Sequence, residues 1–419
     1  MKKKTIIVLA DHPLSPSGVG TQTNYMIDGL LKTGKYRFVC LGGAVKHHDY
    51  TPQKVEPWGE DFVIYPIDGY GEPALIRSLI RKERPDLLWF MTDPRFWGWL
   101  WEIEDEIRPL VPMMYYHVWD NYPFPKYNRY HYESNDVVVT ISKVTDNILK
   151  NVAPSVESIY HPHTVNTEVF KPHEEQEINS FKESFLSANN NKDKIIFFWN
   201  NRNARRKQSG TLIFWFKEFL DKVGRDKACL IMHTDVKDPH GQDLEAIIKE
   251  LGVDSGEVMF SEKKLPQEHL AKIFNAADCT INISDAEGFG LATLESMACG
   301  TPIIVNMTGG LQEQVTDGEE WFGIGIEPKA KAVIGSQEIP YIHEDRIIKE
   351  DFIDALTKIY EMSHEERKEL GLKGRQHVLD NYGFEQYQKG WEKIIDDAIE
   401  KYGSWDTRKH YKHWTIKEI

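Results

Sequence analysis

The sequence predicts an α/β protein with two domains, each built on a doubly wound parallel sheet. Short apolar runs alternate with amphipathic segments along the chain, which is the pattern of strands and helices in parallel sheets. A polar and charged segment over 173–193 separates two halves that have the same strand–helix rhythm. The chain has 419 residues, 41% of them hydrophobic, which is enough for two domains with full cores.

In the first half, apolar runs of strand length and amphipathic runs of helix length define the expected elements. The expected strands are Thr5–Ala10, Phe38–Leu41, Leu87–Met91, Met113–His117, Val137–Ile141 and Ser158–Tyr160. The expected helices are Thr21–Thr33, Ala74–Lys82 and Lys143–Val152. A loop is expected at Asp11–Gly20, and residues 42–72 carry no pattern that predicts an element.

The second half repeats the alternation. Its expected strands are Lys194–Trp199, Cys229–His233, Val258–Phe260, Cys279–Ile283 and Pro302–Val305. Its expected helices are Gly210–Val223, Leu244–Leu251, Pro266–Ala276 and one that carries Glu295. Residues 320–344 are expected to be irregular. Two further helices and a long terminal helix, Phe384–Tyr402, come next, and the polar tail from Gly403 is expected to be loosely held.

These elements divide the chain into a first domain over 1–172, a linker over 173–193 and a second domain over 194–383. The terminal helix over 384–402 and the polar tail over 403–419 follow. Ligands of doubly wound sheets bind at the carboxyl ends of the strands. We therefore expect the functional site where the two domains face each other across a cleft.

The composition disfavours several classes of protein. The net charge is −14, so nonspecific binding of nucleic acid is not expected overall. The four cysteines are far apart and lie mostly in apolar runs, which favours reduced core residues in a cytoplasmic protein and gives no metal-type spacing. The apolar run Thr5–Ala10 is too short for the core of a signal peptide, and no stretch approaches transmembrane length.

The most informative segment contains two glutamates, Glu287 and Glu295, eight positions apart. A buried strand is expected before Glu287 and a helix around Glu295, and Gly288 and Gly290 bracket Phe289 between them. If the whole stretch is helical, the two acids are spread over ~12 Å. That span suits a nucleotide sugar, with one carboxylate on the sugar, the other on the ribose, and helix-start amides facing the diphosphate. A glycine turn before a solvated amphipathic helix is the alternative.

The wider sequence context favours the functional interpretation. Glu287-Gly288-Phe289-Gly290-Leu291 is followed by Leu294-Glu295-Ser296-Met297-Ala298-Cys299-Gly300-Thr301-Pro302, then by Gly309-Gly310 and Glu313. This pattern resembles the donor-site signature of the family 4 retaining glycosyltransferases (glycosyl transferases group 1). The resemblance implies the GT-B fold, two Rossmann-like domains facing across a cleft, with the C-terminal helix crossing back to the N-terminal domain. It also implies retaining transfer of a sugar from a nucleotide-sugar donor, such as a UDP- or GDP-sugar, to an acceptor hydroxyl.

A cationic loop follows the first strand of the second half. A solvated surface is the usual reading of such a loop, but this one lies at a strand end. The resemblance implies that Arg202 and Lys207 bind the donor diphosphate. The arginine would form bidentate hydrogen bonds to phosphate oxygens, and the lysine would act as a point charge. Arg205 and Arg206 receive no role, and Gln208 stands where the family usually has a glycine. No Asp-x-Asp pair occurs, so we expect no metal to be required.

The first half contributes a glycine loop and a strand-end histidine. Gly18 and Gly20 lie in a loop that precedes a helix, where the backbone can approach a phosphate. On local grounds, a flexible turn without a ligand is an equal alternative. The resemblance places the loop near the donor phosphate or sugar and the acceptor. His117 ends a strand and is either a core histidine or, by resemblance, a contact of the transferred sugar. Asp120, displaced from the family pattern, and Tyr122 are acceptor candidates.

The resemblance assigns the expected roles. Catalytic roles fall to His117, Glu287, Arg202 and Lys207. The donor-binding residues are Gly18, Gly20, Arg202, Lys207, Glu287, Gly288, Phe289, Gly290, Leu291 and Glu295. No enzymic nucleophile is evident, so same-face attack by the acceptor is the mechanistic hypothesis.

Several alternatives stay open at this point. The same architecture serves nucleotide-sugar epimerases and would also suit a non-catalytic nucleotide-sugar binding protein. The acceptor is unidentified: a glycan, a lipid-linked sugar, a small molecule or a nucleic-acid base. A tryptophan cluster is either an acceptor platform or ordinary core; it comprises Trp97, Trp99 and Trp101. A basic helix face is either a contact for anionic lipid or nucleic acid or a solvated surface; it comprises Arg77, Arg81, Lys82 and Arg84.

Overall fold

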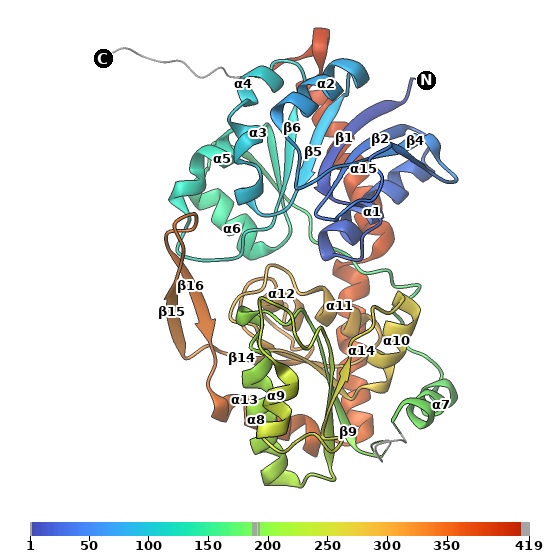
Figure 1. Cartoon of the computed structure of the whole chain (residues 1–419), viewed down its shortest axis with the longest axis vertical. Helices are drawn as coiled ribbons and strands as arrows, with labels where there is room; N and C mark the ends of the chain where they lie inside the picture. The colour runs from blue at the N-terminus through green and yellow to red at the C-terminus, as the bar shows by residue number, and fades with distance from the viewer. Residues whose placement is uncertain (1, 187–190, 192, 412–419) are drawn as a thin grey trace. The chain divides into compact units, whose positions relative to one another are not determined.

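The computed structural model describes residues 2–186, 191 and 193–411 of the chain (Figure 1). Within them the chain forms two compact units, each with its own sheet. The first unit contains residues up to His163, the short segment Ser336–Pro340 and the chain from Glu385 onward. The second contains Thr164–Gly335 and Tyr341–Phe384. The α/β class predicted from the alternation of apolar runs is confirmed.

The sheet of the first unit has eight strands in the order β3-β4-β2-β1-β5-β6-β7-β8. All neighbours pair in parallel except the β3–β4 hairpin at one edge. Central strands are almost continuously apolar because helices cover both faces. The strands are β1 (Lys4–Asp11), β2 (Tyr36–Gly43), β3 (Gln53–Val55), β4 (Gly59–Pro66), β5 (Leu87–Met91), β6 (Met113–His117), β7 (Val137–Thr140) and β8 (Glu157–Tyr160). β3 and β4 occupy the stretch for which the sequence predicted no element.

Helices connect these strands. The Ser17 hydroxyl caps the first helix by accepting from the Gly20 amide at 3.0 Å, so the helix begins inside the expected loop. The helical segments are α1 (Gly18–Lys32), α2 (Pro73–Glu83), η1 (Pro94–Phe96), α3 (Gly98–Trp101), α4 (Glu104–Ile107), η2 (Lys126–Asn128), α5 (Arg129–Glu133), α6 (Lys143–Val152), α15 (Phe384–Tyr402) and η5 (Trp405–Thr407).

The terminal helix α15 packs on the N-terminal half of the chain, as predicted. Figure 1 shows it beside α1 in the first unit. The Tyr387 hydroxyl donates to the Gln22 carbonyl at 3.1 Å, and Gln388 donates to the Tyr25 carbonyl at 3.2 Å. Trp391 is fully buried and meets the ring of Trp89 edge-on at 5.7 Å. The helix therefore completes the core of the first unit although it lies near the end of the sequence.

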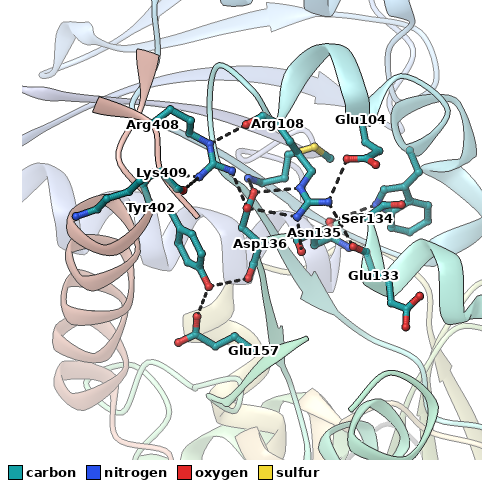
Figure 2. Close-up of polar contacts among 12 residues, drawn as sticks. Glu104, Arg108, Glu133, Ser134, Asn135, Asp136, Glu157, Tyr402, Arg408 and Lys409 are labelled. Atoms are coloured by element: carbon teal, nitrogen blue, oxygen red, sulfur yellow. Dashed lines mark hydrogen bonds and ion pairs between the residues drawn. The ribbon is translucent and has the colours of Figure 1, made fainter. Parts of the chain in front are cut away.

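The prediction of a loosely held tail is wrong for residues 403–411, while 412–419 lie outside the described residues. The side chain of Arg408 is 4% exposed and donates from Nη2 to Asp136 at 2.6 Å (Figure 2). Arg108 bonds the same carboxylate, and the Trp405 amide donates to the Leu110 carbonyl at 2.7 Å. A polar composition is typical of a solvated tail, but these polar groups find buried partners instead.

The second unit has a six-stranded parallel sheet in the order β11-β10-β9-β12-β13-β14. Its core is formed by the inward faces of the strands and of α8 and α13. The strands are β9 (Ile195–Asn200), β10 (Ala228–His233), β11 (Val258–Ser261), β12 (Cys279–Asn282), β13 (Ile303–Asn306) and β14 (Ile324–Ile326). The helical segments are α7 (Glu175–Leu186), η4 (Arg205–Lys207), α8 (Ser209–Val223), α9 (Leu244–Glu250), α10 (Gln267–Ala276), α11 (Leu291–Ala298), α12 (Leu311–Val315), α13 (Lys349–Glu361) and α14 (His364–Asn381).

Two expectations for this half need correction. Residues 320–344 are not irregular: they include β14 and enter a separate antiparallel hairpin of β15 (Ala330–Ile334) and β16 (Ile342–Arg346). Figure 1 shows this hairpin as an orange two-stranded ribbon. The expected domain boundary at residue 172 also shifts, because the second unit already begins at Thr164. Helix α7, placed in the expected linker, packs on α10 of that unit.

Candidate active site

Two loops meet at one edge of the second sheet. β9 ends at Asn200 and β12 ends at Asn282, and these strands are parallel neighbours, so the loops that follow leave from the same edge. The Asp285 amide donates to the Arg206 carbonyl at 2.8 Å. This backbone bond joins the cationic loop after β9 to the glutamate loop after β12. Carboxyl edges of parallel sheets are the usual place for ligands in such folds.

Glu287 lies where the two loops join, and its carboxylate contacts the ammonium group of Lys207. Asn282 adds a hydrogen bond to the same carboxylate at 3.3 Å. Both charged side chains are nearly enclosed, with 9% of Lys207 and 12% of Glu287 exposed. Burial opposes ionisation of Glu287, but the charges of Lys207 and Arg206 outweigh it and lower the pKa of Glu287 to about 2. At neutral pH this residue is a carboxylate that can accept hydrogen bonds.

Sequence reasoning missed Arg206 and Asn282. The Arg206 guanidinium donates to the Ala286 carbonyl, which fixes the turn directly before Glu287. Asn282 is the last residue of β12 and is 1% exposed. Two signals in the sequence could have identified them. Asn282 is a polar residue at the end of an apolar strand, and Arg206 is a further cation directly before Lys207.

Arg202 is held on the other side of β9. Its Nε and Nη2 donate to the carboxylate of Asp238, which follows β10, at 2.6 and 3.1 Å. The Arg202 side chain is 61% exposed. The described contacts thus bring Lys207, but not Arg202, onto Glu287. The role of Arg202 at a diphosphate stays a prediction.

Gln208 has a left-handed backbone, with φ of 57°, which explains why a glycine is usual at this point of the family pattern. Glycine carries no Cβ and adopts this conformation without steric cost. Here the side chain compensates: Gln208 Nε2 donates to Asp285 at 2.6 Å, and its Oε1 accepts from the Thr211 hydroxyl at 2.6 Å. The departure from the family pattern therefore adds a further link between the two loops.

The paired glycines of the pattern serve a close backbone approach. Gly309 has φ of 51°, and a Cβ there would lie 1.8 Å from the Glu287 carbonyl oxygen. The Gly310 amide donates to that same carbonyl at 3.1 Å. Only a chain without side chains at this point can approach the glutamate loop so closely. Gly309 and Gly310 therefore help to fix the position of Glu287.

Glu295 lies in the second turn of α11, the helix that begins just after Gly290. Gly290 offers no side chain to cap the helix, so the first amides of α11 stay available to a ligand. Glu295 is partly buried. Burial raises the pKa of Glu295 to about 8, so this group is largely protonated at neutral pH without a ligand.

In the first unit, Gly18 and Gly20 lie in the first turn of α1. A Cβ at Gly20 would meet the Ser15 hydroxyl at 2.5 Å and the His12 carbonyl at 2.7 Å. Ser17 donates to Asp11, the last residue of β1, at 2.5 Å. The loop is therefore tightly folded against the carboxyl end of β1. Its contact with a donor or an acceptor stays a prediction.

His117 ends β6 and is fully buried. Its Nε2 bonds the Tyr132 hydroxyl at 2.9 Å, while its Nδ1 has no hydrogen-bond partner within the described ranges. Burial lowers the pKa of His117 to about 3, so the ring is neutral. Asp120 and Tyr122, the acceptor candidates, are partly exposed beyond the strand, and Tyr122 accepts from Asn147 at 3.0 Å.

Two tryptophans of the cluster are buried in the core, and one arginine of the basic helix face forms an ion pair within the protein. Trp97 is fully buried and Trp101 is 6% exposed, so both belong to the core. Arg77 forms a bidentate pair with Glu106, with both bonds at 2.7 Å. No helix in the described part of the chain is long and apolar enough to cross a membrane.

Residues 180–377, which contain the whole glutamate and cation arrangement, match the family model described as glycosyl transferases group 1. This segment, just under half of the chain, carries the sequence pattern of that family. The resemblance inferred from the motifs is thereby confirmed, and the match ends within α14 of the second unit.

Curated relatives are similar to this chain over part of their length. D-inositol 3-phosphate glycosyltransferase of Thermomonospora curvata is 31% identical over 166 residues, which cover 39% of this chain and 31% of that relative. The same-named protein of Acidothermus cellulolyticus is 43% identical over 76 residues, covering 18% of this chain and 16% of the relative. The aligned region thus spans less than a third of either relative.

Solved structures share the fold over nearly the whole chain. Sucrose-phosphate synthase from Thermosynechococcus elongatus matches with a TM-score of 0.74 at 18% identity, covering 95% of this chain and 100% of that one. The Anabaena protein HepE in complex with UDP-glucose matches with a TM-score of 0.70 at 14% identity, covering 94% and 100%. These matches confirm the predicted GT-B fold.

Proposed function

We propose that this protein is a retaining glycosyltransferase that moves a sugar from a nucleotide-sugar donor to an acceptor hydroxyl. The observation that carries the proposal is the contact of Glu287 with Lys207, at the carboxyl edge of the second sheet and inside the family match. An ionised carboxylate there can accept hydrogen bonds from sugar hydroxyls. The adjacent cations can balance the charge that develops on a leaving diphosphate.

A UDP-hexose is the proposed donor. HepE, whose fold this chain shares, forms a complex with UDP-glucose. In the proposed arrangement, Glu287 binds hydroxyls of the sugar, Glu295 binds the ribose, and the amides at the start of α11 face the phosphates. Lys207 supplies charge at the diphosphate, with Arg202 as a second contact once it exchanges Asp238 for phosphate oxygens.

The chemistry requires stabilisation of two opposite charges. As the bond between the sugar and the diphosphate breaks, positive charge builds on the sugar and negative charge on the diphosphate. We propose that the acceptor hydroxyl attacks from the face that the diphosphate leaves, which retains configuration, and that a phosphate oxygen takes the hydroxyl proton. In the described ranges no cluster of three or more His, Cys, Asp or Glu side chains is placed to hold a metal ion.

The acceptor is proposed to be a polyol or sugar hydroxyl. Relatives named for D-inositol 3-phosphate and for sucrose phosphate suggest phosphorylated acceptors as the first compounds to try. We also propose a cytoplasmic location, supported by four cysteines that are free and buried.

The test has two stages. A thermal-shift panel of UDP-, GDP- and ADP-sugars identifies the donor, because a ligand that binds only the folded state raises Tm. The protein is then incubated with that donor, with and without inositol 3-phosphate, fructose 6-phosphate or glucose 6-phosphate, and the products are analysed by mass spectrometry. Product only with acceptor supports the transferase. A changed sugar nucleotide without acceptor would instead show an epimerase, and tight binding without any product would show a binding protein.

A further inference from the structure

The hairpin β15–β16 is anchored at its root to the cationic loop. Glu344 of β16 is 2% exposed, and both of its carboxylate oxygens accept from Arg205, from Nη1 at 2.8 Å and from Nη2 at 2.5 Å. A buried carboxylate is costly unless it is paired, and a bidentate arginine pair fixes both distance and direction. Glu344 therefore holds Arg205 in one position.

The next residue ties the hairpin to the other loops at the same edge. The Asp345 amide donates to the Asp285 carbonyl at 2.8 Å, and its carbonyl accepts from Asn306 at 2.8 Å. Its carboxylate accepts from the Thr308 hydroxyl at 2.8 Å. Residues 344 and 345 thus contact the loops after β9, β12 and β13, the three strands that carry the candidate donor site.

Arg205 is the first residue of the short helix η4, which ends at Lys207. The Lys207 amide donates to the Ala204 carbonyl at 2.8 Å, so the turn is rigid once its first residue is fixed. Arg206, the middle residue, reaches the Ala286 carbonyl, and Lys207 reaches Glu287. The position of Arg205 therefore determines where the next two cations point.

We propose that Glu344 is a positioning residue: it binds Arg205, orients η4, and so sets Arg206 and Lys207 against the glutamate loop for donor binding. This inference rests on the proposed function for its kinetic consequence, but its structural part concerns the free protein. The hairpin, which was not predicted from sequence, then fixes the position of the cationic loop after β9. Glu344 itself touches no reacting atom in this proposal.

The first experiment needs no substrate. Hydrogen–deuterium exchange is measured on the free protein for wild type, Glu344→Gln and Arg205→Lys. Arg205→Lys is the milder variant because it keeps the positive charge and loses only the bidentate contact of the guanidinium group. We expect faster exchange at the amides of Ala204, Lys207 and Gln208 in both variants. The matched control is Lys329→Ala, which removes a surface pair between the residue just before β15 and Asp351 of α13, 3.7 Å apart. Unchanged exchange over 204–208 in both variants overturns the proposal.

The second experiment uses the donor selected by the thermal-shift panel. Glu344→Gln should raise KM for the donor and lower kcat/KM about 10- to 100-fold, with KM for the acceptor unchanged, because a small displacement of charged groups costs that much. The double variant Arg205→Gln with Glu344→Gln should lose less than the sum of the single effects, since the two residues act through one contact. Additive effects, or equal changes in both KM values, contradict a positioning role.

The two failures are distinguishable. If the proposed function is wrong, the wild-type protein transfers no sugar, while hydrogen exchange over 204–208 still tests whether Glu344 positions η4. If only the positioning role of Glu344 is wrong, wild type and Glu344→Gln transfer sugar equally well.

Discussion

The ammonium group of Lys207 contacts the carboxylate of Glu287 across 80 positions of sequence. This contact depends on two parallel neighbouring strands, β9 and β12, that deliver their loops to one edge of a sheet. The backbone bond from Asp285 to Arg206 and the side chain of Gln208 reinforce it. An acid that would lose its charge on burial is kept ionised by cations from the adjoining loop.

Glu287→Ala is predicted to reduce transfer sharply. Loss of a hydrogen-bond acceptor at the reacting sugar should lower kcat by about 100-fold, whereas Glu295→Ala should mainly raise KM for the donor. Steady-state kinetics with the identified donor and acceptor check this difference. Equal and small effects of both substitutions would refute the assigned roles.

The raised pKa of Glu295 predicts a pH-dependent stability of the free protein. The folded state keeps the proton up to a pKa of about 8, whereas the unfolded chain releases it near 4.5. Between these values the folded state binds more protons, so stability falls as pH rises. Glu295→Gln should therefore raise Tm relative to wild type at pH 8 and give no gain at pH 4.5. Exposed Glu385→Gln is the control, and an equal Tm difference at both pH values contradicts the prediction.

The left-handed backbone of Gln208 predicts an unusual order of stability. Gln208→Gly loses the side-chain bonds to Asp285 and Thr211 but relieves the steric cost of the Cβ. Gln208→Ala loses the same bonds and keeps that cost, so it should be less stable than the glycine variant by about 1 kcal/mol. Urea unfolding of the two variants measures the difference. An alanine variant at least as stable as glycine would show that φ is not constrained here.

The buried pair of Arg408 and Asp136 predicts that the C-terminal segment contributes to the stability of the first unit. Arg408→Ala removes one of two arginines that bond the Asp136 carboxylate and should cost about 1–3 kcal/mol of unfolding free energy. Lys409→Ala changes the neighbouring exposed side chain and serves as the control. Chemical denaturation followed by tryptophan fluorescence gives both values. Equal effects of the two substitutions would mean that the segment is not held by this pair.

The elements with strong local patterns were predictable from the sequence. Apolar runs predicted β5 and β6, and amphipathic runs predicted α6 and α15, with the bounds that the structure has. These features depend on backbone geometry and on residues a few positions apart, which a linear pattern records. The hairpin of β15 and β16 was missed because β15 is short and largely exposed and because three of the five residues of β16 are charged.

The sequence by itself determined the α/β class, the two-sheet organisation and the family pattern around Glu287, since periodicity and motif spacing are local properties of the chain. Only the tertiary structure decided the partners of the charged groups: Asp238 for Arg202, Glu344 for Arg205, and Asp136 for Arg408. The physical reason is that an ion pair depends on which side chains folding brings within a few ångströms, and here the partners are 36, 139 and 272 positions apart. No pattern within one segment can encode such a choice.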